Sequence, residues 1–205
     1  RIVAATDLPV NADFESGYAR DIDALKNNVR RCVETGVAGL SIEDSSGDDS
    51  QPLFELDEAI ARLRAARAAI DATGEDVVLV GRAECYLVGH ADALNESIKR
   101  LRAYAQAGAD CLYAPGVRDP EHVRAIVRAV APKPVNVLVG YPAPFSLDDF
   151  AQIGVRRISV GGALAGAAWG SFLRAARSLA QGRFDGFAHN ASHGELGALF
   201  AHDVD

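Results

Sequence analysis

The sequence has no methionine, only three cysteines, and only three lysines among its 21 basic residues. Cys32, Cys85 and Cys111 are widely separated and form no Cys-x-x-Cys pair, which excludes a disulfide-scaffold protein and favours a reducing, cytoplasmic environment. No apolar run approaches the roughly 20 residues of a membrane span, and no signal peptide is visible, so no membrane partner is expected.

The sequence also lacks a long basic run. Its net charge is −7, from 28 acidic and 21 basic residues, and this balance argues against nucleic acid or an anionic lipid surface as a partner. With 49% apolar and 24% charged residues over 205 positions, the composition is that of a globular domain with a sizeable core.

Six short apolar runs predict β-strands. Their apolar residues are nearly continuous, as in Val77–Val80, and do not alternate with polar ones, which is typical of a parallel sheet covered by helices. The predicted strands are Leu8–Asp13, Gly39–Asp44, Val77–Glu84, Cys111–Ala114, Pro134–Val139 and Arg157–Gly161.

Helical periodicity fills the segments between these runs. Asp119-Pro120-Glu121 predicts a helix start, with an N-cap, a proline at the first helical position and an acid in the first turn. A long alanine-rich helix is expected to end near Gly182, followed by a short one near Glu195–Phe200. Four glycines lie where helices should end, namely Gly36, Gly74, Gly108 and Gly154.

Six βα units in a row predict either an open doubly wound sheet or most of an eight-stranded barrel. No Gly-x-Gly-x-x-Gly follows the first strand, which removes the usual dinucleotide reason for an open sheet. Arg1–Thr6 is typical of the end of a helix. We therefore predict an (α/β)8 TIM-type barrel, of which residues 1–186 supply about six units and lack two N-terminal ones, with residues 187–205 forming a C-terminal loop and helix.

Acidic side chains follow three consecutive predicted strands. Asp13 and Glu15 follow the first, Glu43 ends the second, and the third ends in Arg82 and Glu84. Carboxylates at neighbouring strand ends suit Mg²⁺, and an arginine facing them can bind a carboxylate or phosphate. A single acid at a strand end is more often a helix cap or a turn former than a metal ligand. Three strands ending in acids inside apolar runs favour a metal site, because unpaired buried charges are costly.

These residues also resemble a known family. The run Asp13–Tyr18 is similar to the Asp-x-[Asp/Glu]-[Ser/Thr]-Gly-[Tyr/Phe] signature of the isocitrate lyase and phosphoenolpyruvate mutase superfamily, and Gly39–Asp44 to its Gly-x-x-x-Glu-Asp strand. Arg82-Ala83-Glu84 resembles its Arg-x-[Asp/Glu] strand, and Gly154–Ser159 its late-strand phrase. The resemblance implies an (α/β)8 barrel that holds Mg²⁺ and a 2-oxo acid or its enolate, and that makes or breaks a C–C or P–C bond beside the carbonyl.

Carried over by position, the resemblance makes Asp13 the direct metal ligand, with Glu15 and Glu43 holding Mg²⁺ through waters. Arg82 would contact the substrate carboxylate or oxyanion. Arg82 and Glu43 are therefore the catalytic candidates.

Three further residues are candidates for substrate binding. Ser16 and Gly17 would let the backbone approach the substrate carboxylate, and a plain tight turn explains them equally well. Asn136 is a candidate for a hydrogen bond with the substrate, and a structural asparagine at a strand end is an equal alternative.

Departures from the family pattern restrict the set of superfamily reactions expected of this sequence. Isocitrate and methylisocitrate lyases carry a Lys-[Lys/Arg]-Cys-Gly-His lid after the Glu-Asp strand, whereas Ser45–Phe54 here has no cysteine, histidine or lysine. Tyr113-Ala114-Pro115 also replaces the lyase glutamate after the fourth strand. Two hypotheses follow: a divergent Mg²⁺-dependent lyase or mutase, or a non-catalytic 2-oxo acid-binding barrel that has lost its lid chemistry.

The expected partners are a small 2-oxo acid or phosphonate and other copies of the chain. The helix near Glu195–Phe200 carries Leu196, Leu199 and Phe200 and needs an apolar surface to cover. The resemblance implies that such a helix is exchanged between subunits of a dimer or tetramer. Folding back on its own barrel is the alternative.

Overall fold

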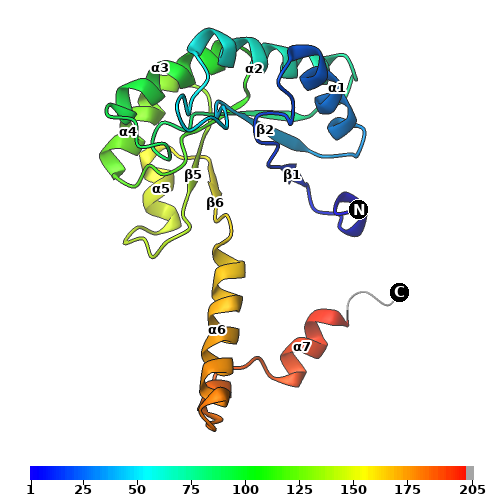
Figure 1. Cartoon of the computed structure of the whole chain (residues 1–205), viewed down its shortest axis with the longest axis vertical. Coiled ribbons are helices and arrows are strands. Elements are labelled where there is room, and N and C mark those ends of the chain that lie inside the picture. The colour runs from blue at the N-terminus through cyan, green and yellow to red at the C-terminus, as the bar shows by residue number, and fades with distance from the viewer. Residues whose placement is uncertain (202–205) are drawn as a thin grey trace. The chain divides into compact units, whose positions relative to one another are not determined.

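The computed structural model describes residues 1–201, which divide into two compact units, Arg1–Ser159 and the described part of Val160–Asp205. The first unit is a six-stranded parallel sheet in which each strand is followed along the chain by a helix (Figure 1). Its strands are β1 (Asn11–Ala12), β2 (Gly39–Glu43), β3 (Val78–Arg82), β4 (Cys111–Tyr113), β5 (Val135–Leu138) and β6 (Arg157–Ser159).

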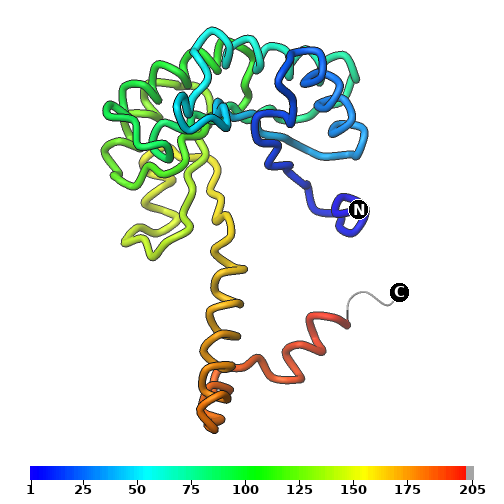
Figure 2. The backbone as a smooth tube through the Cα atoms, in the orientation of Figure 1, coloured from blue at the N-terminus to red at the C-terminus, as the bar shows by residue number. Residues whose placement is uncertain are grey.

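The strands pair in chain order from β1 to β6, and every pair is parallel. The chain therefore winds in one direction through successive βα units, as the tube in Figure 2 shows for this unit. Sequential order without reversal is the arrangement of a barrel wall, whereas a doubly wound sheet reverses its strand order at a switch point. The unit is a curled half-barrel of the TIM type, which confirms the predicted fold class.

Sequence-encoded caps set the helix ends. Asp119 accepts a hydrogen bond from the Glu121 N–H at 2.8 Å at the start of α4, as predicted. Gly36, Gly74, Gly108 and Gly154 all have positive φ after helices, which only glycine adopts without strain. The helices of this unit are α1 (Ile22–Val33), α2 (Leu56–Asp71), α3 (Ala93–Gln106), α4 (Pro120–Val130) and α5 (Leu147–Ile153), preceded by the 3-10 turn η1 (Val3–Ala5).

The core lies between the sheet and the helices, each of which packs against the next along the chain. Leu79 of β3 and Leu101 of α3 are fully buried in it. A Cβ at Gly81 would lie 3.0 Å from the Tyr104 Cβ, so the missing side chain lets α3 approach β3 closely. Because side chains alternate along a strand, Gly81 facing the helices places Arg82 on the opposite, concave face.

The second unit consists of α6 (Ala163–Ala180), the 3-10 turn η2 (Asp185–Phe187) and α7 (His193–Phe200). Both predicted helices are present. Among the described residues of this unit only Ser178 is buried, and Trp169 and Phe172 are more than half exposed. The unit begins at Val160. The barrel boundary at residue 186 and the exchange of residues 187–205 stay predictions. Residues 202–205 of that segment lie outside the described residues.

All six strands are shorter than predicted, and the N-terminal segment differs most from its prediction. The first strand is limited to Asn11–Ala12, because Pro9 lacks an N–H and β1 has a single neighbour, β2. Arg1–Thr6 contains only the three-residue 3-10 turn η1. Over the described residues, no helix has both the length and the apolar content that crossing a membrane would require.

Candidate active site

Asp13, Glu43 and Arg82 meet at the carboxyl ends of the first three strands. Glu43 and Arg82 are direct register partners of β2 and β3, and Asp13 follows β1 immediately. Arg82 Nη1 lies 3.2 Å from Asp13 Oδ1 and 3.3 Å from Glu43 Oε2, so one nitrogen is shared by the two carboxylates. The structure thus brings together the two predicted catalytic residues and the predicted direct metal ligand.

A third carboxylate, Glu84, contacts the same guanidinium. Arg82 Nε donates to Glu84 Oε1, and the Glu84 side chain is only 6% exposed. The guanidinium also lies over the Tyr113 ring, 5.4 Å from its centroid. Asp13, Glu43 and Glu84 together give an excess of two negative charges over Arg82 when all are ionised.

Electrostatics at this cluster follow from burial. Burial raises the pKa of Glu43 to about 7, Arg82 opposes the shift, and the Glu84, Asp13 and Glu15 carboxylates add to it. Burial also raises the pKa of Glu84 above its usual range, against the effect of Arg82. Burial alone would lower the pKa of Arg82, but the hydrogen bond and the charge of Glu84 raise it. Arg82 therefore stays charged and is the fixed cation of the site.

The loop after β1 holds Asp13 in place and is locally strained. Asp13 Oδ1 accepts a hydrogen bond from Ser41 Oγ at 3.4 Å. Glu15 and Tyr18 have positive φ, 47° and 51°, which costs non-glycine residues of order 1–3 kcal/mol each. Glu15, a predicted metal ligand, contacts the cluster through its backbone, where its carbonyl oxygen accepts the Glu43 N–H at 3.0 Å.

The predicted substrate-binding residues of this loop form a tight turn. The Gly17 N–H donates to the Phe14 carbonyl at 2.8 Å, and Gly17 has φ +86°, where a Cβ would lie 3.1 Å from Leu25 Cδ1. Ser16 lines a pocket of about 530 Å³ whose other wall is the segment after β2. Gly17 is buried and Ser16 is half-buried in this turn, and their role in substrate binding stays a prediction.

Asn136 lies on β5, in register with Tyr113 of β4. It is 1% exposed, and its Nδ2 donates to Ser159 Oγ at 3.0 Å. Its Oδ1 is buried with no hydrogen-bond partner among the described residues. Among the described residues no hydrogen bond joins Asn136 to Arg82 or its carboxylates, and its substrate role stays a prediction.

The donor set fits a hard divalent cation, since it supplies carboxylate oxygens with excess negative charge. In the part of the chain that the structure describes, however, no three or more His, Cys, Asp or Glu side chains are grouped to hold a metal ion. Arg82 Nη1 lies between Asp13 and Glu43, so an ion bound there would displace this contact.

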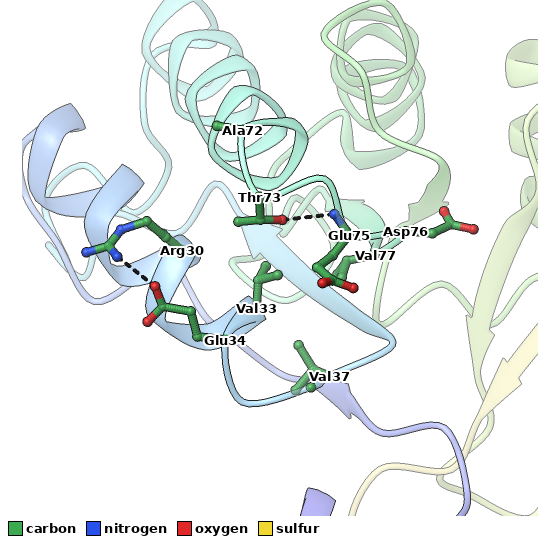
Figure 3. A pocket seen from close by; sticks show the side chains of 10 residues that line it. Arg30, Val33, Glu34, Val37, Ala72, Thr73, Glu75, Asp76 and Val77 are labelled. Carbon is green, nitrogen blue, oxygen red and sulfur yellow. Dashed lines mark hydrogen bonds and ion pairs between the residues drawn. The ribbon is translucent and has the colours of Figure 1, made fainter.

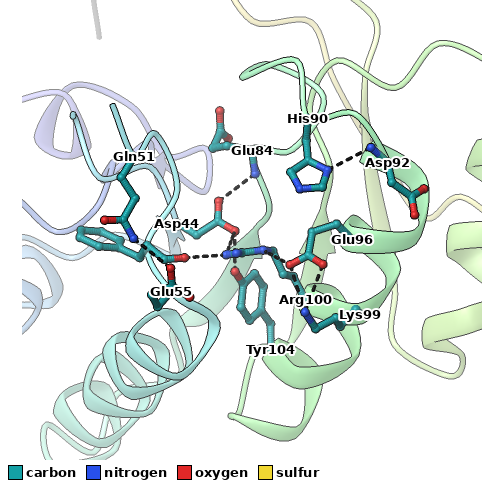
Figure 4. A network of polar contacts seen from close by, with 11 residues as sticks. Asp44, Gln51, Glu55, Glu84, His90, Asp92, Glu96, Lys99, Arg100 and Tyr104 are labelled. Carbon is teal, nitrogen blue, oxygen red and sulfur yellow. Dashed lines mark hydrogen bonds and ion pairs between the residues drawn. The ribbon is translucent and has the colours of Figure 1, made fainter. Parts of the chain in front are cut away.

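The sequence did not single out Asp44 as a functional residue, yet it connects the ends of β2 and β3 (Figure 4). Asp44 is 2% exposed, and its carboxylate accepts from the Glu84 N–H at 2.8 Å, from Arg100 Nη1 at 3.1 Å and from the Tyr104 hydroxyl at 2.5 Å. Arg100 also donates to the Phe54 carbonyl at 2.9 Å. These bonds fix the backbone of Glu84 and hence the carboxylate that orients Arg82.

A second pocket, of about 480 Å³, opens near the amino ends of β2 and β3 (Figure 3). Arg30 and Glu34 form an exposed ion pair at its edge, and Val33, Val37 and Val77 contribute apolar side chains. None of the predicted site residues lines it. In barrels of this type the chemistry is at the carboxyl ends of the strands, so we assign no activity to this pocket.

Comparison with known proteins agrees with this geometry. The family model described as phosphoenolpyruvate phosphomutase matches residues 1–180. An oxaloacetate decarboxylase of Rhodopseudomonas palustris (strain CGA009) is 31% identical over 170 residues, which cover 78% of this chain and 54% of that protein. The chain thus spans about half the length of this curated relative.

Solved structures give the same result. A crystal structure from Burkholderia cenocepacia J2315 with a provisional lyase/mutase assignment has a TM-score of 0.92 at 42% identity, covering 98% of this chain and 72% of that one. Oxaloacetate acetylhydrolase in complex with its product oxalate has a TM-score of 0.78 at 25% identity, covering 96% of this chain and 70% of that one. The relatives are lyases and mutases, and the chain belongs to the phosphoenolpyruvate phosphomutase family, within the isocitrate lyase/phosphoenolpyruvate mutase superfamily.

Proposed function

We propose that the chain carries the active site of a Mg²⁺-dependent lyase or mutase that makes or breaks a C–C or P–C bond beside the carbonyl of a small 2-oxo acid. The observation that carries this proposal is the Arg82 guanidinium held among Asp13, Glu43 and Glu84 at the carboxyl ends of adjacent parallel strands. Cleavage beside a carbonyl leaves an enolate, and preorganised positive charge stabilises that developing oxyanion.

Each residue has a distinct part in the proposal. Asp13 would hold Mg²⁺ as a direct ligand, and Glu15 and Glu43 would hold it through waters. The bound ion supplies Lewis-acid stabilisation of charge on substrate oxygens. Arg82, oriented by Glu84, binds the substrate carboxylate or enolate oxygen.

Two further groups bind the substrate in this proposal. The backbone at Ser16 and Gly17 contacts the substrate carboxylate, and Asn136 supplies a hydrogen bond from the far side of the half-barrel. The buried, unpartnered Oδ1 of Asn136 supports this, because such an atom costs stability unless a ligand or water completes it.

The segment between β2 and α2 favours substrates that need no proton from a lid. Its polar groups bond within the segment: the Asp48 N–H donates to Ser46 Oγ at 3.0 Å, and Ser50 Oγ donates to Asp48 Oδ1 at 2.7 Å. With no cysteine, histidine or lysine there, the segment has no evident general acid. We therefore propose an oxaloacetate-type substrate, which the similarity to an oxaloacetate decarboxylase supports.

A turnover assay tests the proposal. The protein is incubated with oxaloacetate, phosphonopyruvate, isocitrate and 2-methylisocitrate, each with Mg²⁺ and with EDTA. We expect Mg²⁺-dependent turnover of oxaloacetate or phosphonopyruvate, and no cleavage of the two isocitrates. Glyoxylate released from isocitrate, or pyruvate released from 2-methylisocitrate, at about 1 s⁻¹ or faster, an ordinary enzymatic rate, would overturn our reading of the lid.

The second candidate is a 2-oxo acid-binding barrel without catalysis, which the internally bonded segment after β2 favours. Calorimetry with oxalate, an enolate mimic, separates the two candidates. Mg²⁺-dependent oxalate binding without turnover of any of the four substrates would establish the binding protein.

We also propose that the protein assembles as a dimer or tetramer through its second unit. Leu164, Trp169 and Phe172 of α6 and Leu199 and Phe200 of α7 are exposed apolar side chains that a second copy would cover. Light scattering on a truncation before Phe187 tests exchange of the last helix. An unchanged oligomeric state would refute the exchange.

A further inference from the structure

Arg62, in the middle of α2, is a buried arginine that the proposed chemistry does not use. It is 1% exposed, and its guanidinium donates to three backbone carbonyls of the loop after β1. Nη2 lies 2.6 Å from the Ser16 oxygen and 2.5 Å from the Ala19 oxygen, and Nη1 lies 3.1 Å from the Arg20 oxygen. A single side chain therefore fixes the whole turn that follows Asp13.

The burial of this group is energetically demanding. No carboxylate forms an ion pair with Arg62 among the described residues, and its Nε is buried without a hydrogen-bond partner. A buried, unpaired charge is costly unless its hydrogen bonds compensate. An apolar side chain would fill the same place between α2 and the loop after β1 at less cost, so packing alone does not explain an arginine here.

Phe54 links this arginine to the segment after β2. The guanidinium carbon of Arg62 lies 4.6 Å from the centroid of the Phe54 ring. The Phe54 carbonyl accepts from Arg100, and its N–H donates to the Asp44 carbonyl at 2.9 Å. Phe54 is thus held on one side by Arg62 and on the other by the network that fixes Glu84.

We propose that Arg62 is a positioning residue of the active site: its three carbonyl hydrogen bonds hold the Ser16–Arg20 turn in the strained form that presents Asp13, and Phe54 couples this turn to the segment after β2. Two observations agree. The positive φ values of Glu15 and Tyr18 need an external restraint, and both loops line the same pocket of about 530 Å³. The inference rests on the proposed function and assigns to it a residue remote from the chemistry.

The test compares Arg62→Met with Arg67→Met. Methionine keeps the length and apolar stem but removes every donor. Arg67 is the matched control, because it lies on the same helix and bonds to Asp71 and Asp110, away from the turn. Amide hydrogen exchange of residues 14–20, the melting temperature, and Mg²⁺-dependent oxalate binding are measured for each variant.

In Arg62→Met we expect exchange in residues 14–20 to rise and oxalate affinity to fall, each by at least about tenfold, which corresponds to about 1.4 kcal/mol. Arg67→Met lowers the melting temperature without either change. Arg62→Lys restores part of both, since an ammonium can reach some but not all three carbonyls. Where substrate is turned over, kcat falls more than KM rises.

Each outcome decides a separate statement. Wild-type exchange and oxalate affinity in Arg62→Met would overturn the positioning role. If wild-type protein binds no oxalate with Mg²⁺, the proposed function fails, and the exchange data alone decide whether Arg62 fixes the turn. Should Arg62→Met not fold, Phe54→Leu removes the ring contact while keeping an apolar side chain, and faster exchange confined to residues 14–20 is then the required result.

Discussion

The two rims of the half-barrel differ in how deeply their charged side chains are buried. At the carboxyl rim (residues 13–20, 43–55 and 82–88), the four charged residues buried to less than 9% exposure, Asp44, Arg62, Glu84 and Arg100, all lie in or contact the loops. At the amino rim (residues 34–38, 72–77 and 107–110), no described charged residue is that deeply buried: the side chains of the Arg30–Glu34 pair are both more than half exposed, and those of the Arg67–Asp110 pair are 21% and 44% exposed.

This difference separates two uses of charge. Exposed pairs contribute at most about 1 kcal/mol and are readily replaced, whereas a buried charge that loses its partner is strongly destabilising. Removing one charged side chain should therefore lower the free energy of unfolding more at the carboxyl rim than at the amino rim. Four predictions test this contrast, from the largest expected effect to the smallest.

Arg82→Met should lower the free energy of unfolding by about 3–5 kcal/mol at pH 8, because Glu43 and Glu84 lose their cation. The pKa of Glu43 is already raised to about 7, above its unfolded value, so its protonated form favours the folded state and its contribution to stability falls as pH rises from about 4.5 to 7. The loss in the variant should therefore be smaller at pH 5.

Urea denaturation at the two pH values measures this prediction. Arg30→Met at the amino rim is the control and should cost at most about 1 kcal/mol at both values. Equal losses for the two variants would remove the contrast between the rims.

Tyr104→Phe should cost about 1.5–3 kcal/mol, because its hydroxyl donates to the buried Asp44 carboxylate and the apolar replacement leaves that oxygen short of a donor. Thr73→Val at the amino rim also loses a hydroxyl, one that donates to the Ile70 carbonyl at 2.7 Å. That bond is between neutral groups, and its loss should cost about 0.5–1.5 kcal/mol. Thermal melts of the two variants give the comparison, and a larger loss for Thr73→Val would contradict it.

Asp13→Asn should weaken Mg²⁺ binding by at least about tenfold, since it removes one charge and a direct oxygen ligand. Glu43→Gln should have a smaller effect because its contact with the ion is indirect. Asp71→Asn, which changes an exposed carboxylate paired with Arg67, should have none. Calorimetry measures the Mg²⁺ affinity of all three variants. Unchanged Mg²⁺ affinity in Asp13→Asn would contradict the assignment of Asp13 as a metal ligand.

The reactivity of the cysteine thiols measures burial in the wild-type protein, without any substitution. Burial raises the pKa of Cys85, at the carboxyl rim, to about 11, and its side chain is fully buried. Cys32 on α1 is half-buried. Between pH 7 and 9 a thiol reagent should modify Cys32 in the folded protein and leave Cys85 unmodified, as mass mapping would show. Rapid modification of Cys85 would mean that the carboxyl rim opens readily.

Much of this molecule follows from local sequence. The near-continuous apolar runs predict buried parallel strands, and the cap at Asp119-Pro120 and the glycine at Gly154 end helices where the backbone requires them. The family signatures singled out Asp13, Glu43 and Arg82 as candidates. Their proximity could also be expected, because residues at the carboxyl ends of adjacent parallel strands converge. These features depend on residues close together in the chain, or on a topology that repeats.

The residues that hold the site together could not be assigned in the same way. Arg62 and Arg100 look like other helical arginines such as Arg64 and Arg102. The available signal is weak: each arginine lies at helical spacing on a buried face, Arg62 between Ala59 and Ala66 and Arg100 between Ser97 and Tyr104. Which carbonyls they bind depends on loops 42–46 residues away in sequence.

The sequence by itself determined the alternation of strands and helices, the rim at which charge gathers, and the family. Only the tertiary structure decided that Arg82 contacts three carboxylates at once, that Asp44 faces Tyr104 and Arg100, and that Arg62 fixes the turn after Asp13. The physical reason is the separation along the chain over which each kind of interaction acts. Backbone propensities and caps act within a few residues, whereas the free energy of a buried charge is set by partners that folding brings together from separate βα units.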